Sequence, residues 1–218
     1  MITENLENIT RKLPSEVKLV AVSKFHPNED IIEAYDAGQR RFGENRPQEF
    51  CKKVQELPKD IEWHFIGHLQ TNKLKMVLPY ASLVQSVDTQ HLLDAVNEWG
   101  WDNGKVINVL LELHIGAEET KQGFVEEEIL DILFRAESYR NIRFCGLMGM
   151  ATHTDCEEDI RADFCRISSF MDYLKDLFPE YEDFKELSIG MSEDWHLALE
   201  YGATIVRIGT AIFGPRAL

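Results

Sequence analysis

A lysine directly follows a short apolar run near the start of the chain. The run LVAVS covers residues 19–23, and Lys24 comes next. Burying an unpaired ammonium is costly, so a lysine in such a place tends to lose its proton. A neutral lysine is a nucleophile that can form an imine with an aldehyde. The alternative is a lysine that only ends a strand and extends its charge into solvent.

Two short segments near the other end of the chain have the composition of phosphate-binding turns. Ser192 follows Gly190 in one segment, and Gly209 precedes Thr210 in the other. Hydroxyl groups donate to phosphate oxygens, and glycine lets a ligand approach the backbone closely. The two turns together could bind a phosphate monoester, and so hold the phosphate of a molecule attached to Lys24.

Other polar residues follow the expected strands, and most of them have an ordinary explanation. Arg207 shares the inward direction of Gly209, so its guanidinium needs either a ligand atom or a barrel carboxylate as a partner. Asn45 and Asp88 could simply cap helices. We expect no metal site, because the spacing of His64 and His68, and that of His153, Cys156 and Cys165, fits no standard zinc pattern.

Strand-like and helix-like segments alternate along the chain and would position these residues. The expected strands are 18–23, 41–43, 61–66, 83–87, 106–114, 142–147, 186–189 and 204–208. The expected helices are 2–13, 28–38, 47–57, 71–79, 89–99, 125–138, 157–177 and 193–202. The strands are continuous apolar runs, which is typical of parallel strands covered by helices.

Eight such units without a linker predict a single α/β domain over residues 1–218, a TIM-type (β/α)8 barrel with an extra N-terminal helix. A doubly wound open sheet is the alternative, but no GxGxxG motif follows the first strand. In either fold, functional side chains gather at the carboxyl ends of the strands.

Composition narrows the classes of partner. The formal charge of −15 disfavours nucleic acid and anionic membranes. No apolar stretch approaches the roughly 20 residues that cross a bilayer, and the N-terminus lacks the layout of a secretory signal, so we expect a cytoplasmic protein. The four cysteines do not form a disulfide framework and are expected to be reduced.

Several motifs then point to one family. They are AVSK (21–24), FGEN (42–45), WHFIGHLQTNK (63–73), QSVD (85–88), LSIGMS (187–192) and VRIGTAIFG (206–214). In this order they resemble the pyridoxal phosphate homeostasis protein family, which is related to the N-terminal barrel of alanine racemase. The resemblance covers about residues 5–216, although the residues around His114 and the segment 149–158 depart from it.

The resemblance implies a cofactor and a role for each residue of the site. It implies pyridoxal 5′-phosphate (PLP), bound to Lys24 as an aldimine in a barrel of the racemase type (PLP fold type III). It also implies that Ser192, Gly209 and Thr210 hold the phosphate, that Arg207 faces the pyridine nitrogen, and that Asn45 lies beside the ring.

The function expected from the resemblance is PLP homeostasis, meaning storage, buffering or transfer of the cofactor with little or no turnover. An arginine at the pyridine nitrogen disfavours its protonation and weakens the electron sink. Racemases of this type also carry a C-terminal β-domain, whereas this chain ends at Leu218, so we expect a monomeric carrier and not an enzyme. Apo PLP-dependent enzymes or free amino acids are the expected partners. A PLP-dependent amino-acid racemase is the alternative, and a Schiff-base aldolase is a third reading.

Overall fold

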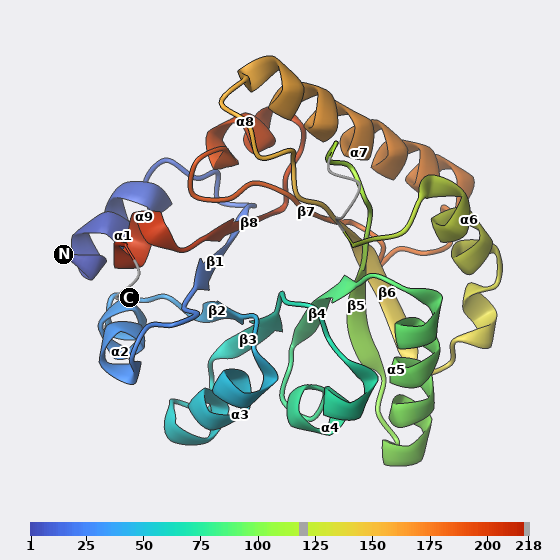
Figure 1. Ribbon diagram of the computed structural model, residues 1–218, viewed down its shortest axis with the longest axis horizontal. Coiled ribbons are helices and arrows are strands. Elements are labelled where there is room, and N and C mark those ends of the chain that lie inside the picture. The colour runs from blue at the N-terminus through green and yellow to red at the C-terminus, as the bar shows by residue number, and fades with distance from the viewer. Residues whose placement is uncertain (118–121, 216–218) are drawn as a thin grey trace.

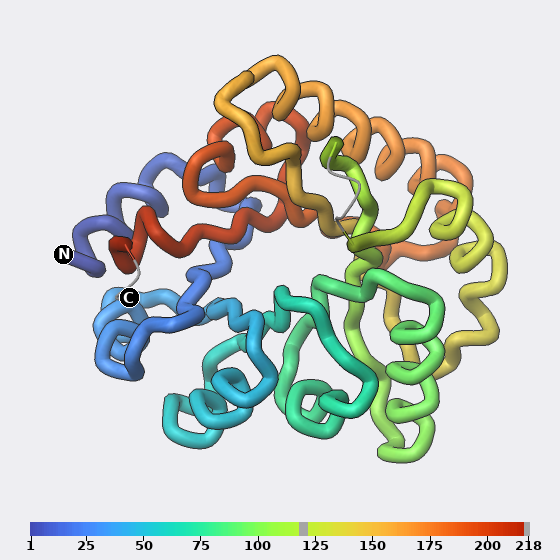
Figure 2. The backbone as a smooth tube through the Cα atoms, viewed as in Figure 1, coloured from blue at the N-terminus to red at the C-terminus, as the bar shows by residue number. Residues whose placement is uncertain are grey.

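Parallel strands that pair in chain order close into a barrel. The computed structural model describes residues 1–117 and 122–215. Its strands are β1 (Lys18–Val22), β2 (Arg41–Glu44), β3 (Glu62–Phe65), β4 (Leu83–Val87), β5 (Ile107–Glu112), β6 (Ile142–Met148), β7 (Glu186–Ser188) and β8 (Ile205–Ile208). The first strand pairs with the last, with Val20 opposite Arg207, and this pairing closes the barrel (Figure 2). The predicted (β/α)8 barrel is therefore confirmed, and the open sheet is excluded.

Helices surround the barrel (Figure 1). They are α1 (Ile2–Thr10), α2 (Asn28–Asp36), α3 (Pro47–Glu56), α4 (Leu74–Val77), α5 (Gln90–Asn103), α6 (Glu126–Phe134), α7 (Glu157–Leu177), α8 (Trp195–Glu200) and α9 (Thr210–Phe213), with 3-10 turns η1 (Thr71–Lys73) and η2 (Ala136–Ser138). The extra helix α1 packs against α9 and α2 (Figure 1), and Asn5 Nδ2 donates to the Ile212 carbonyl at 3.0 Å. None of the described helices is long and apolar enough to span a bilayer.

Two apolar clusters hold the strands in place. A small cluster inside the barrel contains Val20, Leu83, Leu110, Met148 and Ile205. The larger cluster fills the layer between strands and helices. A fully buried Leu or Phe side chain contributes about 2 kcal/mol, so this outer layer carries most of the hydrophobic stabilisation. The carboxyl ends of the strands are left for polar residues.

Several element boundaries differ from the expected ones. The strand 83–87 and the helix 157–177 agree to the residue. The strand expected over 106–114 ends at Glu112, after which Leu113 makes only an isolated bridge to Phe124. The helices expected over 71–79 and 125–138 are each divided into a 3-10 turn and a shorter helix. The short helix α9 was not expected, because four residues show no helical period.

Candidate functional site

Lys24 lies at the carboxyl end of the barrel, two residues after β1. Its side chain is half-buried. Side chains alternate between the two faces of a strand. Ser23 is fully buried on the outer face, where its hydroxyl donates to Glu44 Oε1 at 2.6 Å. Lys24 is therefore on the inner face, together with Val20 of the interior cluster.

Arg207 lies inside the barrel, on β8, with 4% of its surface exposed. Its Nη1 donates to the carbonyl and to the hydroxyl of Ser188, at 2.8 and 2.7 Å, and its Nη2 donates to the Gly149 carbonyl at 2.9 Å. Among the described residues, Arg207 forms no direct ion pair with a barrel carboxylate. Burial lowers the pKa of Arg207 to about 10, so the guanidinium is still charged at neutral pH.

A polar relay crosses the barrel from Arg207. The Ser188 hydroxyl donates to Gln85 Oε1 at 2.6 Å, and Gln85 Nε2 contacts His64 Nδ1 at 2.8 Å. Burial lowers the pKa of His64 to about 3, so the imidazole is neutral and its Nδ1 accepts the hydrogen from Gln85. Neither Gln85 nor Ser188 was assigned a role from the sequence, although both stand in the motifs that carry the family resemblance.

The two expected phosphate turns meet. Ser192, after β7, accepts hydrogen bonds through its Oγ from the backbone N–H of Gly209 (3.2 Å) and of Ala211 (3.5 Å). Gly209 also lies against β1, because a Cβ at this position would stand 3.1 Å from the Val22 carbonyl oxygen. Thr210 is exposed at the start of α9. The turns therefore lie side by side, next to the end of the strand that leads to Lys24.

Asn45 follows β2 on the other side of Lys24. Its Oδ1 is buried without a hydrogen-bond partner in the described residues. A Cβ at Gly67 would overlap the Asn45 carbonyl oxygen and would lie 2.7 Å from the Asn45 Cα, so only glycine fits there. The helix cap considered for Asn45 is not observed, because the residue before α3 is Arg46. The unpaired Oδ1 is available to a ligand.

An acidic wall lies across the barrel from the phosphate turns, at the ends of β4 and β5. Its residues are Asp88 and Glu112, both buried. Asp88 Oδ2 contacts His68 Nδ1 at 2.8 Å, whereas its Oδ1 has no partner in the described residues. Burial and the charge of Asp88 raise the pKa of Glu112 to about 7. Asp88 is not the helix cap considered above, because the Thr89 hydroxyl caps α5. Glu112 was not among the site residues expected from the sequence.

The side chains at the barrel mouth fit a phosphate ester that carries an aldehyde. For such a ligand Lys24 would supply the amine, and the Ser192 and Thr210 hydroxyls would supply donors for the phosphate. Arg207 has five N–H groups, of which the three described contacts use three, so two remain for a ligand atom. The unpaired Oδ1 of Asn45 adds an acceptor. This set of donors and acceptors matches the groups of PLP.

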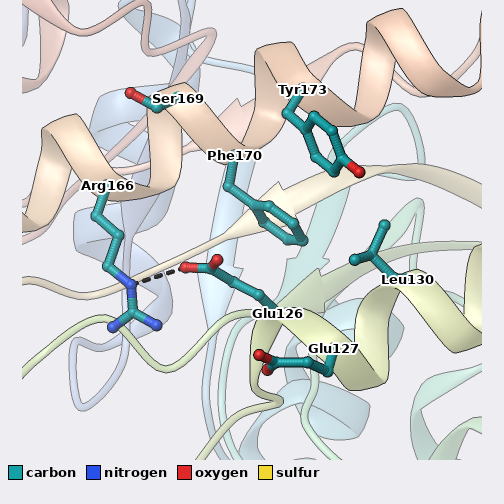
Figure 3. Close-up of a pocket in the computed structure, with 7 residues that line it drawn as sticks. All are labelled: Glu126, Glu127, Leu130, Arg166, Ser169, Phe170 and Tyr173. Atoms are coloured by element: carbon teal, nitrogen blue, oxygen red, sulfur yellow. Dashed lines mark hydrogen bonds and ion pairs between the residues drawn. The ribbon is translucent and has the colours of Figure 1, made fainter.

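A pocket elsewhere on the described surface differs in its chemistry. A surface pocket between α6 and α7 is lined by Glu126, Glu127, Leu130, Arg166, Ser169, Phe170 and Tyr173 (Figure 3). Its one charged contact is the 2.8 Å ion pair of Arg166 with Glu126. Both Cys156 and Cys165 are exposed, and the described residues contain no group of three His, Cys, Asp or Glu that could hold a metal.

Known proteins resemble the chain over nearly its whole length. Residues 1–217 match the family model "Alanine racemase, N-terminal domain". The pyridoxal phosphate homeostasis protein of Aquifex aeolicus (strain VF5) is 41% identical over 201 residues, which are 91% of this chain and 87% of that protein. The Homo sapiens protein of the same name is 38% identical, over 94% of this chain and 79% of that protein.

Solved structures of related proteins have the same fold as the chain. PipY of Synechococcus elongatus PCC7942, in a structure with PLP bound, is 34% identical, with a TM-score of 0.89 over 98% of this chain and 100% of that one. Alanine racemase from E. faecalis shares only the fold, with 18% identity and a TM-score of 0.77 over 98% of this chain and 57% of that one. The chain therefore belongs to the alanine racemase N-terminal domain family and, within it, to the pyridoxal phosphate homeostasis proteins.

Proposed function

We propose that the chain binds PLP as an aldimine of Lys24 and acts in intracellular PLP homeostasis, by storing, buffering or transferring the cofactor with little or no turnover of its own. Relatives of 34–41% identity carry the name of this function, and the related PipY has a structure with PLP bound. When bound, PLP supplies an aldehyde for the lysine and a ring that withdraws electrons.

One observation carries the proposal: the phosphate turns lie against the end of β1, the strand that leads to Lys24. Gly209 contacts Val22, two residues before Lys24, and the Ser192 hydroxyl joins the two turns. A ligand held by Ser192, Gly209 and Thr210 is therefore close to the lysine. Binding the phosphate first would raise the effective concentration of the aldehyde at the amine.

The state of Arg207 favours a carrier over an enzyme. A guanidinium whose pKa is about 10 remains a donor at neutral pH, so it cannot accept a hydrogen bond from a protonated pyridine nitrogen. If Arg207 faces that nitrogen, the nitrogen stays unprotonated and the ring is a weak electron sink. A weak sink slows the removal of an α-proton, which is the step that the alternative, a PLP-dependent amino-acid racemase, depends on.

Chemical trapping tests the proposal. The purified protein loaded with PLP is treated with borohydride, and the modified residue is located by peptide mass spectrometry. We expect the adduct on Lys24 and its loss in Lys24→Ala, whereas the matched Lys52→Ala, at an exposed position on α3, keeps it. A trapped adduct that survives in Lys24→Ala would reject Lys24 as the anchor.

The remaining properties stay predictions of the sequence. They are a single domain over residues 1–218, a cytoplasmic location, a monomeric state, and transfer of the cofactor to apo-enzymes or to free amino acids. Mixing the loaded protein with an apo PLP-dependent enzyme, and following the recovery of that enzyme's activity, tests the transfer.

A further inference from the structure

A buried charged cluster lies behind Lys24, on the outer side of the barrel. Lys53 of α3 is 4% exposed and Glu44 of β2 is fully buried. Lys53 Nζ donates to Glu44 Oε1 at 2.7 Å and to Glu49 Oε1 at 2.7 Å. None of these groups faces the barrel interior, so they do not belong to the cofactor site described above.

The cluster holds the backbone on both sides of Lys24. Before the lysine, Lys53 Nζ donates to the Ser23 carbonyl at 2.8 Å. After it, the backbone N–H of Phe25 donates to Glu49 Oε1 at 2.8 Å. Because Lys53 also binds Glu49 Oε1, the same two side chains fix the peptide groups that flank Lys24.

The backbone at this point is strained and needs such support. Phe25 has φ of 69°, the only positive φ of a residue other than glycine among the described residues. This region is unfavourable for a bulky side chain and persists only where the surroundings fix it. Besides the hydrogen bond to Glu49, the Arg46 guanidinium lies over the Phe25 ring, 4.4 Å from its centroid. The turn therefore directs Lys24 at an energetic cost that its neighbours offset.

Stability alone does not account for a buried lysine at this place. Replacing a buried ion pair with apolar residues of similar volume is often neutral or stabilising. Here Glu44 Oε2 is also buried without a partner in the described residues, which is a further cost. An apolar contact between α3 and β2 would hold the helix at least as well, but it could not bind the Ser23 carbonyl.

We propose that Lys53, together with Glu49, is a positioning residue that holds the turn at Lys24 so that its amine can form the imine with the cofactor aldehyde. This role rests on the proposed function. It requires that loss of the two hydrogen bonds reduces imine formation without weakening the binding of the phosphate and the ring.

The test compares imine formation with non-covalent binding in the same variants. The double variant Lys53→Met/Glu44→Gln removes the two buried charges together, so that neither is left buried alone, and the partly exposed Glu49 keeps the Phe25 N–H as a donor. Lys52→Met is the control on the same helix. The imine is followed by its visible absorption during titration with PLP. The non-covalent probe is 4-deoxypyridoxine 5′-phosphate, which has a methyl group in place of the aldehyde.

In the double variant, the apparent affinity for PLP measured by imine absorption should fall by about tenfold or more, because small displacements of a reacting group have large effects. Its affinity for the methyl analogue should stay unchanged, and Lys52→Met should behave as wild type. Glu49→Gln keeps an acceptor for the Phe25 N–H and should retain imine formation, whereas Glu49→Ala should reduce it.

Each of the other possible outcomes contradicts one part of the proposal. Equal losses of imine formation and analogue binding would mean that Lys53 only supports the fold, and unchanged imine formation would remove its role altogether. In either case the wild-type adduct on Lys24 would still stand. If the wild-type protein forms no trappable adduct, the proposed function itself fails.

Discussion

Burial favours the neutral form of two ionisable side chains inside the barrel, but their charge at neutral pH differs. Arg207 keeps its charge, because its pKa falls only to about 10. Glu112 is close to losing its charge, because burial and Asp88 raise its pKa to about 7. The first residue therefore supplies a permanent donor at the site, and the second makes the barrel mouth sensitive to pH.

The stability of the ligand-free protein should report the state of Glu112. A carboxyl group whose pKa rises from 4.5 to about 7 on folding binds more protons in the folded state between these values. Its contribution is therefore lost as pH increases through that window, by up to about 3 kcal/mol. Glu112→Gln lacks this loss, so its stability relative to wild type should increase from pH 4.5 to 7 and then level off.

Urea denaturation of both proteins across pH 4.5–8, a range set by the two pKa values, measures this difference. Glu127→Gln, at an exposed position on α6, is the control and should show no such trend. A constant difference between Glu112→Gln and wild type would mean that folding leaves the pKa of Glu112 unchanged.

At the scale of elements, the loops that follow neighbouring strands pack directly against each other or against the end of the next strand. The loop after β3 contacts the loop after β2 through Gly67 and the backbone of Asn45. The loop after β8 contacts the end of β1 through Gly209 and Val22. Neighbouring strand ends therefore fix one another, and a change in one loop should move the site residue of the next.

Gly67→Ala tests this coupling. Its methyl group would overlap the backbone of Asn45, so the loop must shift and we expect a destabilisation of about 1–3 kcal/mol. PLP affinity should fall as well, because Asn45 moves. Gly104→Ala is the control for destabilisation without overlap: a Cβ there meets nothing within 4 Å, but φ is 61°, so stability should fall while PLP affinity stays unchanged. Normal PLP affinity in a folded Gly67→Ala protein would show that the position of Asn45 does not matter for binding.

The phosphate turns can be tested separately from the lysine. Ser192→Ala and Thr210→Val should each weaken PLP binding by about 1–3 kcal/mol, the usual range for a hydrogen bond to a charged group. Neither change should weaken the binding of pyridoxal, which lacks the phosphate. If wild-type protein binds pyridoxal and PLP equally well in an equilibrium titration, these turns do not hold a phosphate.

Elements with a long apolar pattern could be predicted from the sequence, whereas contacts between distant elements could not. The helix 157–177 carries apolar residues at helical spacing, among them Phe164, Ile167 and Leu174, and the structure agrees with its bounds. Gln85 contacts Ser188 across 103 residues, a pairing that only the closed barrel creates. Glu49 and Lys53 resemble an ordinary exposed i,i+4 pair on a helix. Their burial depends on Glu44, whose outward direction follows from the register of β2.

At the scale of the whole molecule, the barrel separates opposite charges across its mouth. The Arg207 guanidinium and the two neutral phosphate turns lie at β7 and β8, and the acidic wall of Asp88 and Glu112 lies at β4 and β5. The chain as a whole carries a formal charge of −15. An amino acid approaching bound PLP would therefore meet carboxylates opposite the phosphate, which disfavours its own carboxylate and leaves an amine as the better-accepted group.

Proton exchange at the α-carbon of amino acids distinguishes a carrier from an enzyme. Transfer of PLP to a free amine requires only that the amine reaches Lys24. Removal of an α-proton also leaves a carbanion that the electron sink must stabilise, and Arg207 at the pyridine nitrogen would weaken this sink. We therefore expect the loaded protein in D₂O to release PLP to amines but to incorporate almost no deuterium at Cα across a panel of amino acids, as followed by NMR. Lys24→Ala measures the background. Exchange that depends on Lys24 and reaches about 1 s⁻¹, the range of working enzymes, would replace the carrier with a racemase-like catalyst.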